Sequence, residues 1–230
     1  MASVTVHHLE NSRSLRILWL LEELGLAYDL VEYPRDPVTL RAPAALIALH
    51  PLGKAPVVTV QEADGERVTL AESGAIIEHF VEAEGRLAPA RGTPEHRRYR
   101  YFMHYAEGSL MAPLLVKLIT GNVRTAKMPF LAKPVAKAIA DQIDGAFSDP
   151  EIDRHFSFLD AELASRPYFA GAEFTAADIQ MFYGVEAGLS RAGDTPRPMV
   201  RAWLDRVRAR DGYKRATARG GENKPHGARR

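Results

Sequence analysis

Two short polar segments of the chain bring together side chains that suit the binding of a small charged ligand. Glu72 and Ser73 stand where a segment rich in β-branched residues passes into an apolar helical pattern. A carboxylate binds an ammonium group, and a serine hydroxyl beside the free amides of a first helical turn binds a carboxylate. The pair therefore suits a ligand that carries both groups, and its structural alternative is a simple helix N-cap at Ser73 with Glu72 in solvent.

The second segment holds Asn11, Ser12 and Ser14 at the start of another apolar helical pattern. Polar donors at the positive end of a helix stabilise an anion, although Ser14 also stands where an N-cap is expected. The chain contains no cysteine, so any sulfur chemistry must use a thiol that a ligand brings. His7 and His8 precede this segment on a predicted strand, where neighbours point to opposite faces and do not share a metal ion. We expect one buried and one exposed imidazole.

The first 83 residues are predicted to form a small α/β domain that positions both segments. The predicted elements are, in order, a strand at 4–9, a helix at 14–24, a strand at 28–33, a helix near 43–49, strands at 57–60 and 68–71, and a helix from Ser73. The first strand, helix and strand form a βαβ unit with parallel strands and a right-handed crossover. Asp64-Gly65, between two apolar runs, predicts an antiparallel hairpin.

The rest of the chain carries no clear strand pattern. Glycine and proline in residues 84–93 predict a linker, and Thr93 followed by Pro94 predicts the next helix start. The expected helices are residues 94–119, 130–147, 150–165, 175–190 and 197–210. They form an all-α domain over 94–216, in which Thr175 and Asp178 have the spacing of a capping box.

The last residues, 217–230, are expected to be a disordered basic tail that can be removed without loss of fold or activity. The formal net charge is +1, and because this tail is strongly basic the remainder of the chain is slightly acidic. The chain without its tail therefore lacks the clustered basic surface that is typical of a nucleic-acid-binding protein. No apolar run is long enough to cross a membrane and no signal-peptide pattern is present, so we expect a cytoplasmic protein without a membrane partner.

A third segment, residues 50–58, reads His-Pro-Leu-Gly-Lys-Ala-Pro-Val-Val. In its order and spacing with the other two segments, and ahead of an all-helical domain, the chain resembles the cytosolic glutathione S-transferase superfamily over about residues 3–215. The resemblance implies a thioredoxin-like N-terminal domain (βαβ-α-ββα), an all-α helical-bundle domain and a cis bond between Ala55 and Pro56. Since no tyrosine or cysteine lies near Ser12, the chain is similar to the bacterial serine/asparagine type rather than the tyrosine type.

The resemblance also implies which residues bind glutathione and its acceptor. Ser12, or else Asn11 or Ser14, would donate to the sulfur, because a hydroxyl donor at a helix start lowers a thiol pKa. The other glutathione contacts are expected from Lys54 for the glycyl carboxylate, Pro56 and Val57 for the cysteinyl backbone, and Glu72 and Ser73 for the γ-glutamyl group. The expected electrophile pocket comprises Tyr101, His104, Tyr105 and Met111.

The implied function is that of a glutathione transferase with glutathione as cosubstrate and no metal, of the kind that serves detoxification. Conjugation to a small hydrophobic electrophile, disulfide exchange and peroxide reduction all start from the thiolate, and the residues do not choose among them. Family members form homodimers, so the same is expected here. The alternative is a non-catalytic glutathione-transferase-like interaction module, since a fold does not fix a function.

Overall fold

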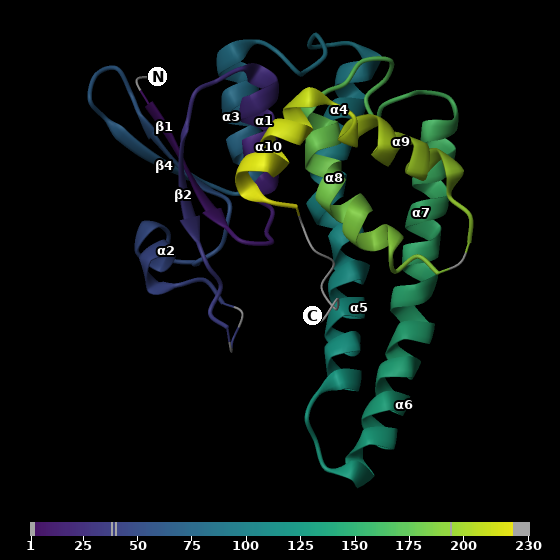
Figure 1. The fold of residues 1–230 in the computed structure, drawn as a ribbon. Helices are drawn as coiled ribbons and strands as arrows, with labels where there is room; N and C mark the ends of the chain where they lie inside the picture. Colours follow the sequence, from purple (N-terminus) through teal and green to yellow (C-terminus); the bar gives the residue numbers. More distant parts are fainter. Residues whose placement is uncertain (1–2, 38, 40, 194, 223–230) are drawn as a thin grey trace.

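The computed structural model describes residues 3–37, 39, 41–193 and 195–222. The first domain is a four-stranded sheet with helices packed against it (Figure 1). Its elements are β1 (Ser3–Leu9), α1 (Leu15–Leu24), β2 (Asp29–Tyr33), α2 (Ala44–Leu49), β3 (Val57–Gln61), β4 (Arg67–Ala71) and α3 (Ser73–Glu84). The predicted order of strands and helices is therefore confirmed.

The sheet has the strand order β2-β1-β3-β4, with β1 parallel to β2 and antiparallel to β3. Because alternate side chains of β1 point to opposite faces, His8 lies on the face of Val6, which belongs to the main core. His7 points the other way and bonds to Thr59 and Tyr33. Both imidazoles are buried, at 5% and 3% exposure, so the expectation of one exposed histidine was wrong.

The described part of the second domain is helical (Figure 1). Its elements are α4 (Pro94–Tyr105), η1 (Ala106–Leu110), α5 (Met111–Thr125), η2 (Phe130–Ala132), α6 (Lys133–Ile143), η3 (Asp144–Ser148), α7 (Asp149–Ala164), α8 (Ala176–Leu189), α9 (Pro198–Arg208) and α10 (Asp211–Gly220). The segments η1 and η3 are π-helical, so α4 runs on into α5 and α6 into α7. The predicted break between the helices at 130–147 and 150–165 is absent, because the π-helical turn η3 joins α6 to α7 just before Pro150.

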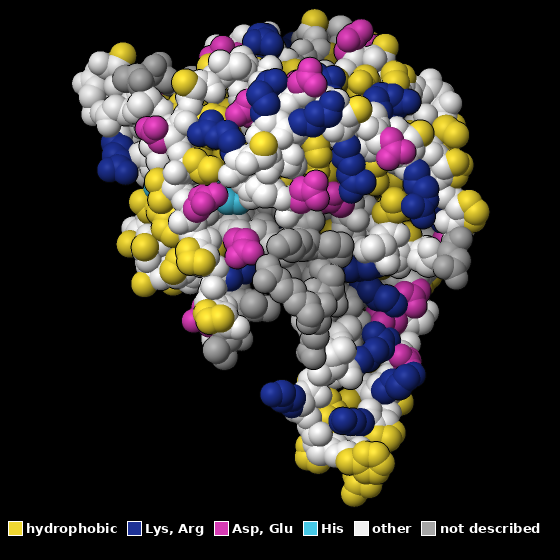
Figure 2. All heavy atoms as spheres, viewed as in Figure 1, with side chains coloured by type: hydrophobic (Ala, Val, Ile, Leu, Met, Phe, Trp, Pro, Cys, Tyr) yellow, Lys and Arg dark blue, Asp and Glu magenta, His cyan; other side chains and the backbone are white. Residues whose placement is uncertain are grey.

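The helices α5 and α6 form an antiparallel hairpin that projects from the body of the molecule (Figure 1). Apolar side chains gather at its free end (Figure 2). Phe130 is 81% exposed and Leu131 is 83% exposed, and apolar residues on α6 such as Val135 and Ile139 are exposed as well. None of the helices in the described ranges is long and apolar enough to cross a membrane.

The two domains share one hydrophobic core, in which Trp19 of α1 is central. Its ring lies 5.5 Å from Phe174, 5.4 Å from Phe182 and 5.2 Å from Tyr213, measured between centroids. These three partners all belong to the helical half of the chain. The position of α1 is therefore fixed by the second domain as well as by the sheet.

The last described helix, α10, extends past the boundary that the sequence predicted after residue 216. It packs along α1, and the guanidinium carbon of Arg219 lies 3.9 Å from the ring centroid of Tyr28. The carbonyl of Gly220 accepts a hydrogen bond from His8. Residues 217–220 thus contact the first domain, which corrects the predicted start of the tail; residues 223–230 lie outside the described part of the chain.

Candidate active site

The starts of α1 and α3 lie side by side. Arg16, in the first turn of α1, donates a hydrogen bond from Nη1 to the hydroxyl of Ser73 at 3.2 Å. A helix start carries amides without helical partners and the positive end of the helix dipole. Two such ends next to each other form a region that suits an anionic ligand.

Arg16 is buried, with only 2% of its surface exposed. Its Nη1 also donates to Glu107 of η1 at 2.5 Å, and Arg13 donates to the same carboxylate oxygen at 3.0 Å. Burial acts to raise the pKa of Glu107, but Arg16 and Arg13 outweigh it and hold that pKa below its ordinary value. Nε and Nη2 of Arg16 are buried and have no hydrogen-bond partner, so the cluster holds donors that its own carboxylate does not use.

Tyr183 of α8 lies against the same two arginines. The guanidinium carbons of Arg13 and Arg16 lie 4.9 Å and 5.5 Å from its ring centroid, which are cation–π distances. The start of α1, the π-helical turn η1 and the middle of α8 therefore meet at one place.

The structure separates the three candidates for contact with a ligand thiol. Ser14 is fully buried at the N-cap position of α1, yet it caps nothing, because its hydroxyl bonds to His8 Nδ1 at 2.8 Å instead of to a helix amide. Ser12 keeps 6% exposure, and its Oγ lies 2.7 Å from that of Ser14. Asn11 is partly exposed. Ser12 is thus the less buried of the two serines that belong to this network.

Backbone strain marks the same two segments. Asn11 has φ 51° and Glu72 has φ 71°, and they are two of the three non-glycine residues with positive φ in the described ranges. Asparagine tolerates this region, whereas glutamate pays a conformational cost there. Such strain is kept mainly at binding positions, which favours a ligand role for Glu72 over the solvated alternative. The carbonyl of Asn11 accepts from Arg35 at 3.0 Å, which fixes its loop.

The bond between Ala55 and Pro56 is cis, as the resemblance implied. Val57, by contrast, is 0% exposed and pairs within the sheet with both His7 and Ala71. Its backbone has no free face for a peptide ligand, so the expected pairing through Val57 was wrong. Ala55, just before the proline, is only partly buried, and Lys54 beside it is exposed.

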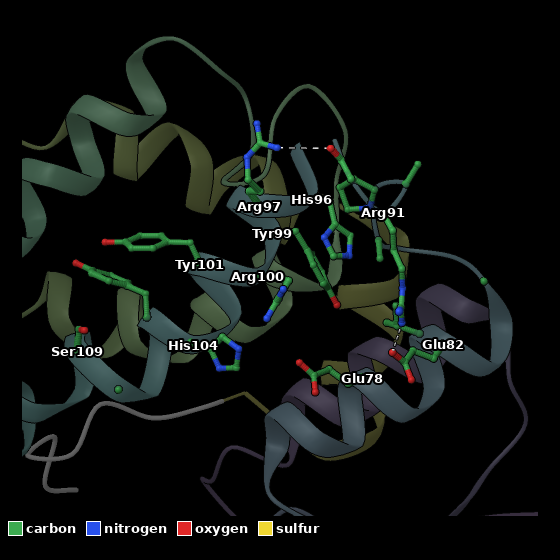
Figure 3. Close-up of a pocket in the computed structure, with 18 residues that line it drawn as sticks. Glu78, Glu82, Arg91, His96, Arg97, Tyr99, Arg100, Tyr101, His104 and Ser109 are labelled. Atoms are coloured by element: carbon green, nitrogen blue, oxygen red, sulfur yellow. Dashed lines mark hydrogen bonds and ion pairs between the residues drawn. The ribbon is translucent and has the colours of Figure 1, made fainter. Parts of the chain in front are cut away.

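The four residues expected in the electrophile pocket do not all line one cavity. Tyr101, His104 and Tyr105 line a cavity of about 1380 Å³ between α3 and α4, opposite Glu78 (Figure 3). None of the residues assigned to glutathione lines this cavity. The Tyr105 hydroxyl bonds to His155 of α7, and Met111 lies apart from the cavity, partly buried against the core.

Sequence reasoning missed His8, Arg16, Glu107 and Tyr183. A signal for Arg16 was present, because it is the only charged residue among the seven that begin α1, all of which are buried. A charge inside an apolar pattern requires a partner in the folded chain. Its partner Glu107 gave no such signal, because a single glutamate in a predicted helix is ordinarily a solvent-exposed residue. No group of three or more potential metal ligands occurs among the described residues.

Two family profiles match this chain. One is described as "Glutathione S-transferase, N-terminal domain" and matches residues 12–83; the other, "Glutathione S-transferase, C-terminal domain", matches residues 126–211. The chain is 33% identical to glutathione S-transferase 1 of Saccharomyces cerevisiae over 218 residues, which cover 91% of this chain and 92% of the yeast protein. It is 34% identical to glutathione S-transferase 3 of Schizosaccharomyces pombe, over 87% of this chain and 81% of that protein.

Solved structures agree with these sequence matches. A glutathione S-transferase of Actinobacillus pleuropneumoniae superposes with a TM-score of 0.74 at 28% identity, over 94% of this chain and 92% of that one. A glutathione transferase of Burkholderia graminis, solved with two glutathione molecules per subunit, gives a TM-score of 0.74 at 19% identity, over 94% and 88% of the two chains. The second of these supports the fold alone.

Proposed function

The chain belongs to the glutathione transferase superfamily and is a glutathione transferase, and we propose that Ser12 is the residue that activates the sulfur of glutathione. Ser12 fits this role because it stands just before the positive start of α1 and is the least buried residue of a buried polar network. A hydroxyl donor and a helix start both favour a thiolate over a thiol. The enzyme is thereby assigned to the serine type.

In this assignment the γ-glutamyl group of glutathione binds at the start of α3. Arg16 donates to the Ser73 oxygen, which leaves the Ser73 hydroxyl proton free to donate to the ligand carboxylate together with the first-turn amides. Glu72 is exposed, and its carboxylate accepts a hydrogen bond from the ligand ammonium. The cysteinyl backbone pairs with Ala55 as at a sheet edge, and Lys54 supplies charge for the glycyl carboxylate.

The acceptor substrate is assigned to the region where the Tyr183 ring faces Arg13. Met111 lies close to this helix, since its sulfur is 3.5 Å from where a Cβ on Gly184 would lie. Tyr101, His104 and Tyr105 line a different cavity and are not assigned to the acceptor. The choice among conjugation, disulfide exchange and peroxide reduction depends on the acceptor.

Retention on immobilised glutathione, followed by turnover of a generic aryl halide, tests the proposed function. A catalytic protein is expected to be retained and to turn over the halide, and Ser12→Ala is expected to be retained but slow. Retention without turnover of halides, disulfides or peroxides would instead support a non-catalytic interaction module.

Glu72→Ala is expected to weaken glutathione binding about tenfold to a hundredfold, because it removes a charge-assisted hydrogen bond to the ligand ammonium. Turnover at saturating glutathione should change little. The measurement is a calorimetric titration with glutathione, and Glu66→Ala, which removes another exposed carboxylate from the same domain, is the control. Equal affinities in the three proteins would reject this role for Glu72.

The active form is proposed to be a cytoplasmic homodimer. The exposed apolar side chains of α5 and α6, including Leu115, Ile119, Val135 and Ile139, are consistent with burial against a partner. A stable interface of this kind buries at least about 1,000 Å². Light scattering at micromolar concentration should give about twice the mass of one chain, and a monomeric mass would contradict the proposal.

A further inference from the structure

A chain of hydrogen bonds leads from Ser12 into the protein and ends on α10. Ser12 Oγ lies 2.7 Å from Ser14 Oγ, Ser14 Oγ lies 2.8 Å from His8 Nδ1, and His8 Nε2 lies 2.9 Å from the carbonyl oxygen of Gly220. Ser14 also has a longer contact of 3.4 Å with the carbonyl of Leu9. All three side chains are buried.

The carbonyl at the inner end fixes the direction of every bond in this chain. A carbonyl only accepts, so His8 Nε2 carries a hydrogen, and in the neutral imidazole Nδ1 must accept. Ser14 therefore donates to His8, and Ser12 donates to Ser14. Ser12 Oγ also accepts from the Ser14 amide at 3.2 Å. In this resting arrangement the Ser12 proton points inward, and the outer side of its oxygen is an acceptor.

This direction is opposite to what a thiolate needs, because a thiolate must receive a hydrogen bond from Ser12. An incoming thiol, however, is itself a donor and matches the resting acceptor. The network then has the geometry to carry the thiol proton inward, since each oxygen accepts one proton while it passes on another.

We propose that Ser12, Ser14 and His8 form a proton relay that takes the thiol proton of bound glutathione to His8. The S–H bond breaks and a new O–H bond forms on Ser12; the former Ser12 proton passes to Ser14, and the former Ser14 proton passes to His8 Nδ1. The products are a thiolate, to which Ser12 now donates, and an imidazolium. The relay rests on the proposed contact between Ser12 and the sulfur.

The surroundings of His8 suit an acceptor that is neutral at rest and charged only while the thiolate exists. Burial lowers the pKa of His8, so the imidazole is neutral at pH 7. Three groups work against burial and favour the charged form: the Gly220 carbonyl, Glu32 on β2 and Glu10, which directly follows β1. Once the thiolate forms, its negative charge is a fourth group that favours the charged form of His8.

The helix α10 positions His8 for this role. Gly220 lies so close that a Cβ there would come within 2.4 Å of Leu18 and 3.2 Å of the His8 ring. Glycine is thus needed for the carbonyl to reach Nε2. The last turn of α10 therefore sets the tautomer of a residue in the first strand.

Counting protons in the wild-type protein tests the relay directly. Glutathione is mixed with the protein near pH 7 in weak buffer with an indicator dye, while the ultraviolet absorbance of the thiolate is followed. The relay predicts that thiolate forms with far less than one proton released per thiolate. It also predicts that the His8 nitrogen resonances change to those of imidazolium with glutathione but not with S-methylglutathione. One released proton per thiolate, or a neutral His8 in the complex, would overturn the relay.

Variants separate the relay from a structural role of the same residues. In His8→Gln and in Ser14→Ala, proton release should rise to about one per thiolate, and kcat/KM should fall at least about tenfold. The control is His7→Gln, which alters the neighbouring buried histidine on the opposite face of β1 and should behave as wild type.

The two proposals fail in different ways. If Ser12→Ala loses thiolate stabilisation while His8→Gln and Ser14→Ala match the wild type, the role of Ser12 stands and the relay is rejected. If Ser12→Ala itself has no effect, the proposed function of Ser12 fails, and the relay with it. Should His8→Gln not fold, Ser14→Ala and the wild-type proton count still decide.

Discussion

Ser12→Ala is expected to slow turnover by about one to two decades while affinity for glutathione stays nearly unchanged. The substitution removes one hydrogen bond to a charged sulfur, which is typically worth about 1.5 to 3 kcal/mol. The peptide remains held by Glu72, Ser73 and the backbone at Ala55, so binding and activation should separate. Steady-state kinetics with glutathione and an aryl halide, together with a glutathione titration, measure both quantities.

Asn11→Ala is the matched control, because Asn11 precedes Ser12 in the same loop and is partly exposed. Its turnover should stay within about threefold of the wild type. A large loss in Asn11→Ala with none in Ser12→Ala would move the sulfur contact to Asn11. If neither variant is slowed, a backbone amide at the start of α1 is the donor.

Asp178→Ala is expected to lower the free energy of unfolding by about 3 to 5 kcal/mol, the largest stability effect of the substitutions considered. The carboxylate is fully buried and accepts from the amide and hydroxyl of Thr175, from the amide of Phe169 and from the indole of Trp203. Removing it leaves these donors without a partner inside the core. Chemical denaturation followed by tryptophan fluorescence measures the loss.

Thr175→Ala is the comparison for Asp178→Ala, since it removes one hydroxyl from the same capping box. It should cost only about 1 kcal/mol and leave turnover unchanged. If Asp178→Ala costs no more than Thr175→Ala, the aspartate acts only as a helix cap and does not join α8 to the segments around Phe169 and Trp203.

Local patterns were sufficient to predict the first domain and the capping box. The βαβ unit and the hairpin follow from apolar periodicity and from the Asp64-Gly65 turn, both of which are properties of neighbouring residues. The helix α10 was missed for the opposite reason. Its buried side chains are few, including Tyr213 and Ala216, and it forms because α1 offers a surface to it. Such tertiary support leaves little trace in the sequence.

The same distinction between local sequence patterns and long-range contacts holds for the candidate active site. Ser12, Glu72 and Ser73 were recognisable because each stands at a helix start, which is a local feature. His8 was not, because the carbonyl that orients it is 212 residues away, and Glu107 lies 91 residues from Arg16. The expected role of Val57 was wrong because the sequence does not show which backbone groups are already paired within the sheet. Ala55 precedes the strand β3 and is only partly buried.

The central claim is that Ser12 stabilises the thiolate of glutathione, and the pKa of the bound thiol tests it most directly. Thiolate absorbance of the glutathione complex is followed against pH in the wild type, Ser12→Ala and Asn11→Ala. The wild type and Asn11→Ala should ionise well below the ordinary thiol pKa of about 8.5, and Ser12→Ala should ionise about one to two units higher than the wild type. Identical titration curves for the wild type and Ser12→Ala would contradict the claim.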